Sequence, residues 1–182
     1  MNPLNATKRN YAKAIVCGLL VTPLLGATAS ADEGATVPFT MTVLTDEAYG
    51  AHVKSGKYEH AIAKLTQRDG RAINRFAEQN NLCVAYTKTT DLTNAVAACE
   101  EAIAEVKERE ALASNKPKYS QAARAYRSDL AIALSNQGVL LAVQGAIDEA
   151  RATFEAAMEL KAGASRIASR NLDRLVKKNS SG

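Results

Sequence analysis

The most regular feature of the chain is a helical spacing of apolar residues that begins at Thr45. Apolar residues recur there at spacings of three and four, as at Ala150, Phe154 and Ala157, which is the period of a helix that buries one face. Alanine is abundant in this region, aromatic residues are few, and Pro117 is the only proline. The pattern predicts an all-α domain.

Short polar or glycine-bearing breaks divide the helical region into hairpins. Each break is flanked by two helical stretches that are long enough to pack against each other. The predicted breaks are 55–57, 88–91 and 143–148, between the stretches 48–54 and 58–67, 82–87 and 92–106, and 130–141 and 150–158. We therefore predict three units, at about residues 45–75, 76–109 and 119–161.

The three hairpins align on an alanine in the first turn of each second helix, namely Ala61, Ala95 and Ala150. The step from Ala61 to Ala95 matches a period of roughly 34 residues, which is typical of stacked helical repeats. The step from Ala95 to Ala150 is longer. The surplus can sit within 105–124, where Pro117 interrupts a charged helix.

The residues around those alanines resemble the tetratricopeptide repeat family. The third unit carries Leu134, Gly138, Leu141, Gly145, Ile147, Ala150, Phe154 and Ala157; the second Leu82, Cys83, Tyr86, Leu92, Ala95, Cys99 and Ala102; the first Ala48, Gly56, Tyr58, Ala61 and Leu65. The first unit departs from the family pattern at Tyr49 and Arg68, where small residues are usual. The resemblance covers about residues 45–161.

The resemblance implies a right-handed superhelix of about three such hairpins. Small residues let paired helices approach closely, and a large apolar residue one turn later fills the gap between them. Residues 162–182 follow the third unit and carry an apolar stripe at Ile167, Ala168, Leu172, Leu175 and Val176. We expect a C-terminal capping helix there, which stacked repeats need for solubility, followed by a frayed end.

Residues 1–31 have the features of a secretory signal peptide. Lys8, Arg9 and Lys13 form a positive start, residues 14–27 are almost wholly apolar, and 29–31 read Ala-Ser-Ala. We expect cleavage between Ala31 and Asp32, and a periplasmic or secreted protein. The alternative is an uncleaved anchor, but the apolar stretch is shorter than the ~20 residues that span a bilayer.

Removal of the signal peptide changes the charge balance. The whole chain has a net charge of +4, and positions 1–31 hold three of its 23 basic residues and none of its 19 acidic ones. The mature chain would carry 20 basic and 19 acidic residues, a net +1, which gives no reason to expect nucleic-acid binding. It has no second stretch long enough to cross a membrane, so we expect no membrane association after cleavage.

Residues 32–44 differ from the rest because they are rich in β-branched residues and contain Pro38. They could form a short extended arm. No other extended segment is evident to pair with it, so an irregular N-terminal tail is the simpler interpretation.

No arrangement of catalytic or metal-binding residues stands out. His52 and His60 are the only histidines, and nucleophile and phosphate-binding motifs are absent. Carboxylate pairs such as Glu100 and Glu101 lie among lysines and arginines, as on a solvated helix face. We expect no enzyme activity, no cofactor and no metal.

Cys83 and Cys99 are the two cysteines left after cleavage. In the repeat pattern they take the small-residue position of one helix and the filler position of its partner, so both should face one seam. An oxidising compartment favours a disulfide there. Two buried free thiols are the alternative; a redox-active pair is a weaker one, because the spacing is unlike Cys-x-x-Cys.

The resemblance also implies a site, because the family grips extended peptides in a groove lined by the first helix of each hairpin. An asparagine there often bonds the peptide backbone, and Asn81 and Asn136 take the matching places. Lys54, Asn80, Thr87 and Lys88 would face the same groove, and the lysines could attract a carboxylate. The alternative is that all six are ordinary polar helix residues.

These features favour an exported scaffold that binds a protein or peptide partner of undefined identity. One rival is a thiol- or disulfide-dependent envelope factor that uses Cys83 and Cys99. Another is a self-assembling structural homo-oligomer in which an arm at residues 36–44 is swapped between chains.

Overall fold

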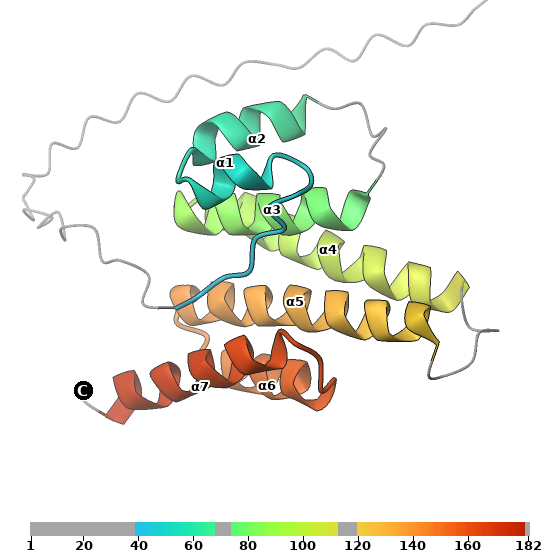
Figure 1. Ribbon diagram of the computed structural model, residues 1–182. Helices are drawn as coiled ribbons and strands as arrows, with labels where there is room; N and C mark the ends of the chain where they lie inside the picture. The colour runs from blue at the N-terminus through green and yellow to red at the C-terminus, as the bar shows by residue number, and fades with distance from the viewer. Residues whose placement is uncertain (1–38, 68–73, 113–119, 181–182) are drawn as a thin grey trace, which may run out of the picture. The chain divides into compact units, whose positions relative to one another are not determined.

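A computed structural model describes residues 39–67, 74–112 and 120–180 of the protein. These residues form seven α-helices and no strand, so the predicted all-α class is confirmed (Figure 1). The helices are α1 (Gly50–Lys54), α2 (Tyr58–Thr66), α3 (Arg75–Lys88), α4 (Leu92–Leu112), α5 (Gln121–Gln144), α6 (Ile147–Glu159) and α7 (Ser165–Ser180). The predicted signal peptide, its cleavage site at Ala31 and Asp32, and Arg68 lie outside the described residues.

The helices are arranged as a row with a second set packed behind it. Each helix packs against the next one in the chain, and α1, α3, α5 and α7 also contact one another in that order. These four helices therefore form one continuous row, while α2, α4 and α6 each lie against two of its members (Figure 1). One side of this row carries an extended segment of the chain.

Left-handed residues mark the turns between paired helices. Gly56 follows α1 with φ +78°, and Gly145 ends α5 with φ +82° and donates its backbone N–H to carbonyls of the last turn. Thr90 adopts the same region, at φ 59°, between α3 and α4. A β-branched residue is strained there, so this turn is held by the packing of its two helices.

The seams between paired helices are closed by small residues. Ala61, Ala95 and Ala150 have no exposed surface, and Phe154 on α6 is fully buried against α5. Close approach at these positions lets the larger side chains interlock to a dense core.

The extra length between the second and third units is partly helical. α4 continues to Leu112 and α5 already begins at Gln121, so both are longer than the stretches that their apolar pattern marked out. At the other end of the chain, α7 runs to Ser180 and packs on α5 and α6. Among the described residues, no helix is both long and apolar enough to span a membrane.

Candidate binding groove

Residues 39–44 cross the row of helices as an extended segment, which we call the arm. The arm is the blue stretch of chain that runs past α5 and α3 in Figure 1, and its first residues also bond α7. It has no regular secondary structure of its own. Its backbone is bonded instead by asparagine side chains from three helices, at every second residue.

The first contact joins Asn171 on α7 to Thr40. The backbone N–H of Thr40 donates to Asn171 Oδ1 over 2.9 Å, and Asn171 Nδ2 donates to the Thr40 carbonyl over 2.7 Å. Arg174 adds a hydrogen bond from Nη1 to Thr40 Oγ1 at 2.8 Å. One amide thus satisfies both polar groups of one backbone residue.

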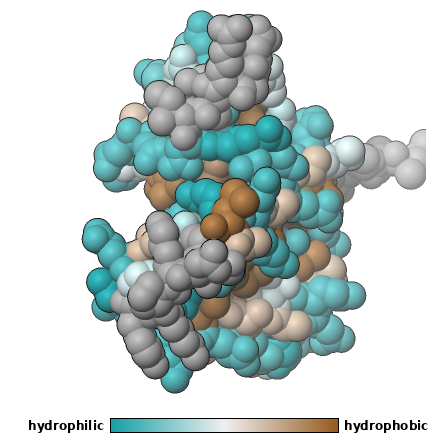
Figure 2. Space-filling view, turned by 90° about the vertical axis from the view of Figure 1, so that its right-hand side faces the viewer, coloured by the Kyte–Doolittle hydropathy of each residue, from teal (hydrophilic) through white to brown (hydrophobic). Residues whose placement is uncertain are grey.

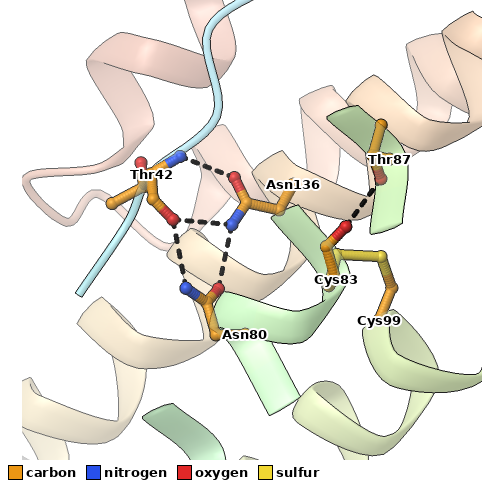
Figure 3. The surroundings of a disulfide bond; sticks show 6 residues. All are labelled: Thr42, Asn80, Cys83, Thr87, Cys99 and Asn136. Atoms are coloured by element: carbon orange, nitrogen blue, oxygen red, sulfur yellow. Dashed lines mark hydrogen bonds between the residues drawn. A yellow bond between two sulfur atoms is a disulfide. The ribbon is translucent and has the colours of Figure 1, made fainter. Parts of the chain in front are cut away.

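The second contact repeats this arrangement at Thr42 and adds another amide. Asn136 on α5 accepts the Thr42 N–H over 2.8 Å and donates to the Thr42 carbonyl over 2.9 Å. Asn80 on α3 donates to the same carbonyl over 3.0 Å and accepts from Asn136 Nδ2 over 2.9 Å (Figure 3). The two amides and the Thr42 backbone form one closed network.

The third contact fixes the end of the arm. Asn81 on α3 accepts the Leu44 N–H at 3.0 Å and donates to the Leu44 carbonyl at 3.1 Å. Its Nδ2 also lies 3.2 Å from the carbonyl oxygens of Glu47 and Ala48. Ala48 and Tyr49 have φ values of 46° and 56°, so Asn81 braces a strained turn that leads from the arm into α1.

The geometry follows from the chemistry of the amide and the period of an extended chain. An asparagine side chain offers a donor and an acceptor side by side, which matches the N–H and C=O of a single extended residue. Residues two apart present these groups in the same direction, so amides on successive helices of the row meet Thr40, Thr42 and Leu44 in turn. These amides recognise the backbone of the extended segment and not its side chains.

The odd-numbered residues of the arm supply its apolar anchors. Phe39 is only 4% exposed and packs with Val139, Phe154 and Leu175. Met41 and Val43 are partly buried, and Met41 reaches three of the hydrophobic clusters. The arm is therefore held by apolar contacts as well as by the amides.

The four buried amides would destabilise the fold if they lost their hydrogen-bond partners. Asn80, Asn81, Asn136 and Asn171 have no exposed surface, and a buried polar group that loses its hydrogen bond destabilises the fold by about 1–3 kcal/mol. In this structure the arm supplies the backbone N–H and C=O groups that the four amides bond.

The structure thus brings together three of the predicted groove residues, Asn80, Asn81 and Asn136. The backbone that they bond belongs to the same chain and not to a partner. Thr87, also expected in the groove, is fully buried, and its Oγ1 donates to the Cys83 carbonyl over 2.7 Å and not to the arm (Figure 3). A threonine inside a helix commonly bonds the carbonyl four residues back in this way.

Lys54 and Lys88 line a cleft of about 330 Å³ beside the arm. Its other walls are Phe39, Thr40, Met41 and Val43 from the arm and Val53, Tyr58 and Val84 from the helices. Burial lowers the pKa of the Lys88 ammonium below its ordinary value. The groove region therefore retains open space even with the arm in place.

Cys83 and Cys99 are joined by a disulfide between α3 and α4, with sulfur atoms 2.02 Å apart (Figure 3). Both residues are 1% exposed. Cys83 lies two residues after Asn81 on the same helix, so the disulfide fixes the helix that carries two of the groove amides against α4.

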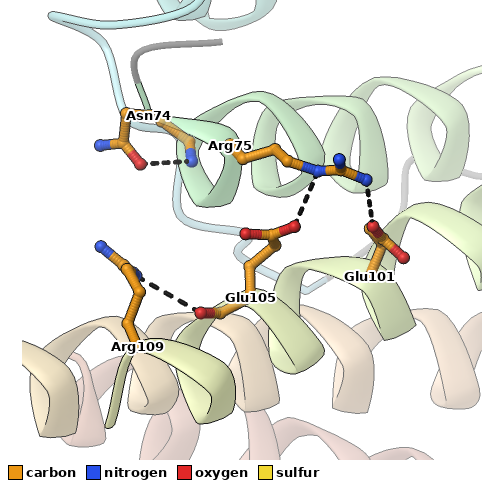
Figure 4. Close-up of polar contacts among 6 residues, drawn as sticks. Asn74, Arg75, Glu101, Glu105 and Arg109 are labelled. Atoms are coloured by element: carbon orange, nitrogen blue, oxygen red, sulfur yellow. Dashed lines mark hydrogen bonds and ion pairs between the residues drawn. The ribbon is translucent and has the colours of Figure 1, made fainter. Parts of the chain in front are cut away.

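The charged residues near the start of α3 belong to the scaffold and not to the groove. Arg75 pairs with Glu101 and, over 2.7 Å, with Glu105 on α4 (Figure 4). The hydrogen bond to Glu101 is the main cause of the raised pKa of Arg75. Arg75 and Glu101 are half exposed, and such surface pairs contribute little stability.

Arg109 makes a second scaffold contact, between α4 and α5. It bonds Asp129 over 3.0 Å and lies 5.3 Å from the centre of the Phe76 ring. Burial raises the pKa of the Asp129 carboxyl, and Arg109 opposes that rise. This contact joins α4 to α5.

The histidines form no metal site within the described ranges. The rings of His52 and His60 stack with centroids 4.8 Å apart. No group of three potential metal ligands occurs in the part of the chain that the structure describes.

Few large apolar residues of the described chain are highly exposed. Leu112, at 81%, and Val176, at 40%, are the only large apolar residues with high exposure among the described residues. The face shown in Figure 2 is largely hydrophilic, and its apolar groups gather toward the middle of the face.

Asn171 is the groove residue that the sequence analysis missed. It precedes Leu172 as Asn81 precedes Leu82, and the step from Asn136 to Asn171 is close to the step from Ala61 to Ala95. That spacing was the available signal. The apolar stripe of the same segment suggested only a cap, although α7 contacts the arm just as α3 and α5 do.

No family model, no characterised protein and no solved structure matches this chain.

Proposed function

We propose that the protein is an exported, tetratricopeptide-like scaffold that binds an extended segment of a partner protein in the cell envelope. The observation that carries this proposal is the spacing of Asn171, Asn136 and Asn81, each of which bonds both polar backbone groups of one residue in an extended segment. This is chemistry for holding a peptide, and it involves no reacting group.

The right-handed superhelix and the signal peptide belong to the same proposal. The repeat step from Ala61 to Ala95 and the row formed by α1, α3, α5 and α7 support the former. The basic start, apolar stretch and Ala29-Ser30-Ala31 site support the latter. An exported protein would also meet the oxidising conditions in which the Cys83–Cys99 disulfide persists.

The buried disulfide gives little support to a thiol-exchange factor. Exchange requires attack by a thiolate on an accessible sulfur, and both cysteines are 1% exposed. We therefore assign the disulfide a stabilising role in the scaffold.

A crosslinking pull-down from intact producing cells tests the proposal. The wild-type protein is compared with the double variant Asn81→Ala/Asn136→Ala and with Asn94→Ala, which removes an exposed amide on α4. We expect one envelope protein to be captured by the wild type and by Asn94→Ala, and to be lost from the double variant. Equal capture by all three would contradict a function in the groove.

A further inference from the structure

We propose that the arm is an exchangeable internal ligand, and that the partner segment that replaces it is an extended, uncharged peptide with large apolar residues at its first, third and fifth positions. This inference rests on the proposed function and adds the chemistry of the ligand and the control of access to the groove.

The arm can leave without unravelling a helix. All the hydrogen bonds recorded for the backbone of Thr40 and Thr42 are made to side chains of α3, α5 and α7. Those helices are positioned by their packing on α4, α6 and one another. The arm is joined to this body through residues 45–49, which include the left-handed pair Ala48 and Tyr49.

Departure of the arm from an otherwise empty groove is unfavourable, whereas replacement of the arm by another extended peptide costs much less. Removal would take the backbone partners from four amides that are fully buried while the arm is in place. A second extended peptide restores the hydrogen bonds that the amides make to Thr40, Thr42 and Leu44. The net cost of exchange at these three residues then reduces to the difference between the two ligands. The cleft lined by Met41, Val43 and Val84 offers an incoming segment a place to begin.

The arm itself indicates the preferred ligand. Phe39, at the first position, packs with Phe154 and Leu175. Val43, at the fifth position, lies against Val53 and Val84. A charge in these surroundings would be desolvated without a partner. The second and fourth positions must keep their N–H groups, because these donate to Asn171 and Asn136, so proline is excluded there.

The fit of the arm is also imperfect at one atom. Thr42 Oγ1 is buried and has no hydrogen-bond partner among the described residues. A buried hydroxyl without a partner opposes binding. A ligand with valine at this fourth position should therefore bind more tightly than the sequence of the arm.

The test uses the full mature chain and labelled synthetic peptides. The probe is Phe-Thr-Met-Thr-Val-Leu, the sequence of residues 39–44, and binding is followed by fluorescence anisotropy. Two variants release the internal arm in different ways: Thr42→Pro removes the donor to Asn136, and Phe39→Asp places a charge in the apolar anchor site. Circular dichroism verifies that each variant remains helical.

We expect both released variants to bind the probe about tenfold or more tightly than the wild type, the gain expected when the arm leaves the groove free in about a tenth of molecules or fewer. The same probe with proline at the fourth position should fail to bind, and one with valine there should bind more tightly. Adding Asn136→Ala to either released variant should abolish binding.

Three results would overturn the inference. The first is a failure of Thr42→Pro or Phe39→Asp to bind the probe although circular dichroism shows that the variant is helical. The second is equal binding of the probe by the wild type and both variants. The third is a wild-type dimer that light scattering no longer finds in Thr42→Pro, because the natural occupant would then be the arm of a second copy. Capture of a groove-dependent partner without probe binding would defeat this inference alone; probe binding without capture would defeat the proposed cellular function alone.

Discussion

The ring of Phe154 on α6 occupies the space that a side chain at Gly138 on α5 would need. A Cβ built on Gly138 would lie 2.6 Å from Phe154 Cε1 and 2.7 Å from Cδ1. The ring is fully buried, so it has little room to move. The glycine is required by this close approach, since it lies within a helix where its flexibility is a disadvantage.

Gly138→Ala should therefore destabilise the protein, although alanine is the better helix former. Overpacking costs about 1–3 kcal/mol and the gain in helix propensity about 1 kcal/mol, so we expect a net loss of roughly 1 kcal/mol in urea unfolding. Gly163→Ala is the control, because nothing lies within 4 Å of its Cβ position. Recovery of stability in Gly138→Ala/Phe154→Leu would verify the cause; equal effects of the two single variants would contradict it.

The helical class could be predicted from sequence because its signals are local. Apolar residues three and four apart, and glycines such as Gly56 and Gly145 where left-handed turns occur, lie within single hairpins. The occupant of the groove could not be predicted in this way. Thr42 and Asn136 are 94 residues apart, and Thr40 and Asn171 are 131 apart. No local pattern links them.

The hydrogen bonding in the groove explains why the arm was expected to be an irregular tail and is instead an extended, bound segment. The sequence shows no strand that could pair with the arm, because amide side chains supply the hydrogen bonds that a neighbouring strand would otherwise make. Asn81 and Asn136 were expected to bond the backbone of an extended peptide, and the backbone that they bond belongs to residues 42–48 of the same chain. A segment of the same chain is present at a high effective concentration, which favours it as the occupant and which no residue pattern encodes.

Asn171→Ala should loosen one end of the arm only. The variant removes both hydrogen bonds to the Thr40 backbone, whereas Asn136 and Asn81 still hold Thr42 and Leu44. Loss of about 1–3 kcal/mol predicts amide exchange at Thr40 that is about tenfold to a hundredfold faster, with smaller changes at Thr42 and Leu44. Hydrogen exchange by NMR provides the measurement. Uniform acceleration along the arm would indicate that it docks as one unit.

Thr42→Val and Ser135→Ala should each stabilise the protein. Both hydroxyl oxygens are buried and have no hydrogen-bond partner within the described part of the chain. Replacing an unsatisfied hydroxyl with an apolar group of similar or smaller size removes a desolvation cost of about 1–3 kcal/mol. We expect a higher urea midpoint at an unchanged m-value. Thr153→Val is the control, because that hydroxyl bonds the Glu149 carbonyl over 2.7 Å on an exposed helix face.

The disulfide should stabilise the fold without taking part in exchange. Cys83 and Cys99 are 16 residues apart, and closing a loop of that length constrains the unfolded chain by roughly 3 kcal/mol. We expect Cys83→Ala/Cys99→Ala to remain helical and to unfold more easily by about that amount. In the native wild type, iodoacetamide should modify neither residue unless reductant and denaturant are both present. Rapid modification with reductant alone would indicate an accessible, exchangeable pair.

Lys88→Met should stabilise the protein in a manner that depends on pH. Burial lowers the pKa of Lys88 in the folded state below 10.5, so folding disfavours its charged form. Below the folded pKa this penalty is complete, and it disappears as pH rises to 10.5, where the unfolded chain also releases its proton. The advantage of Lys88→Met over wild type should therefore be largest near neutral pH and should shrink toward pH 10.5. Urea unfolding at several pH values measures it, with exposed Lys64→Met as the control; a constant difference across this range would show that burial of the charge is not its cause.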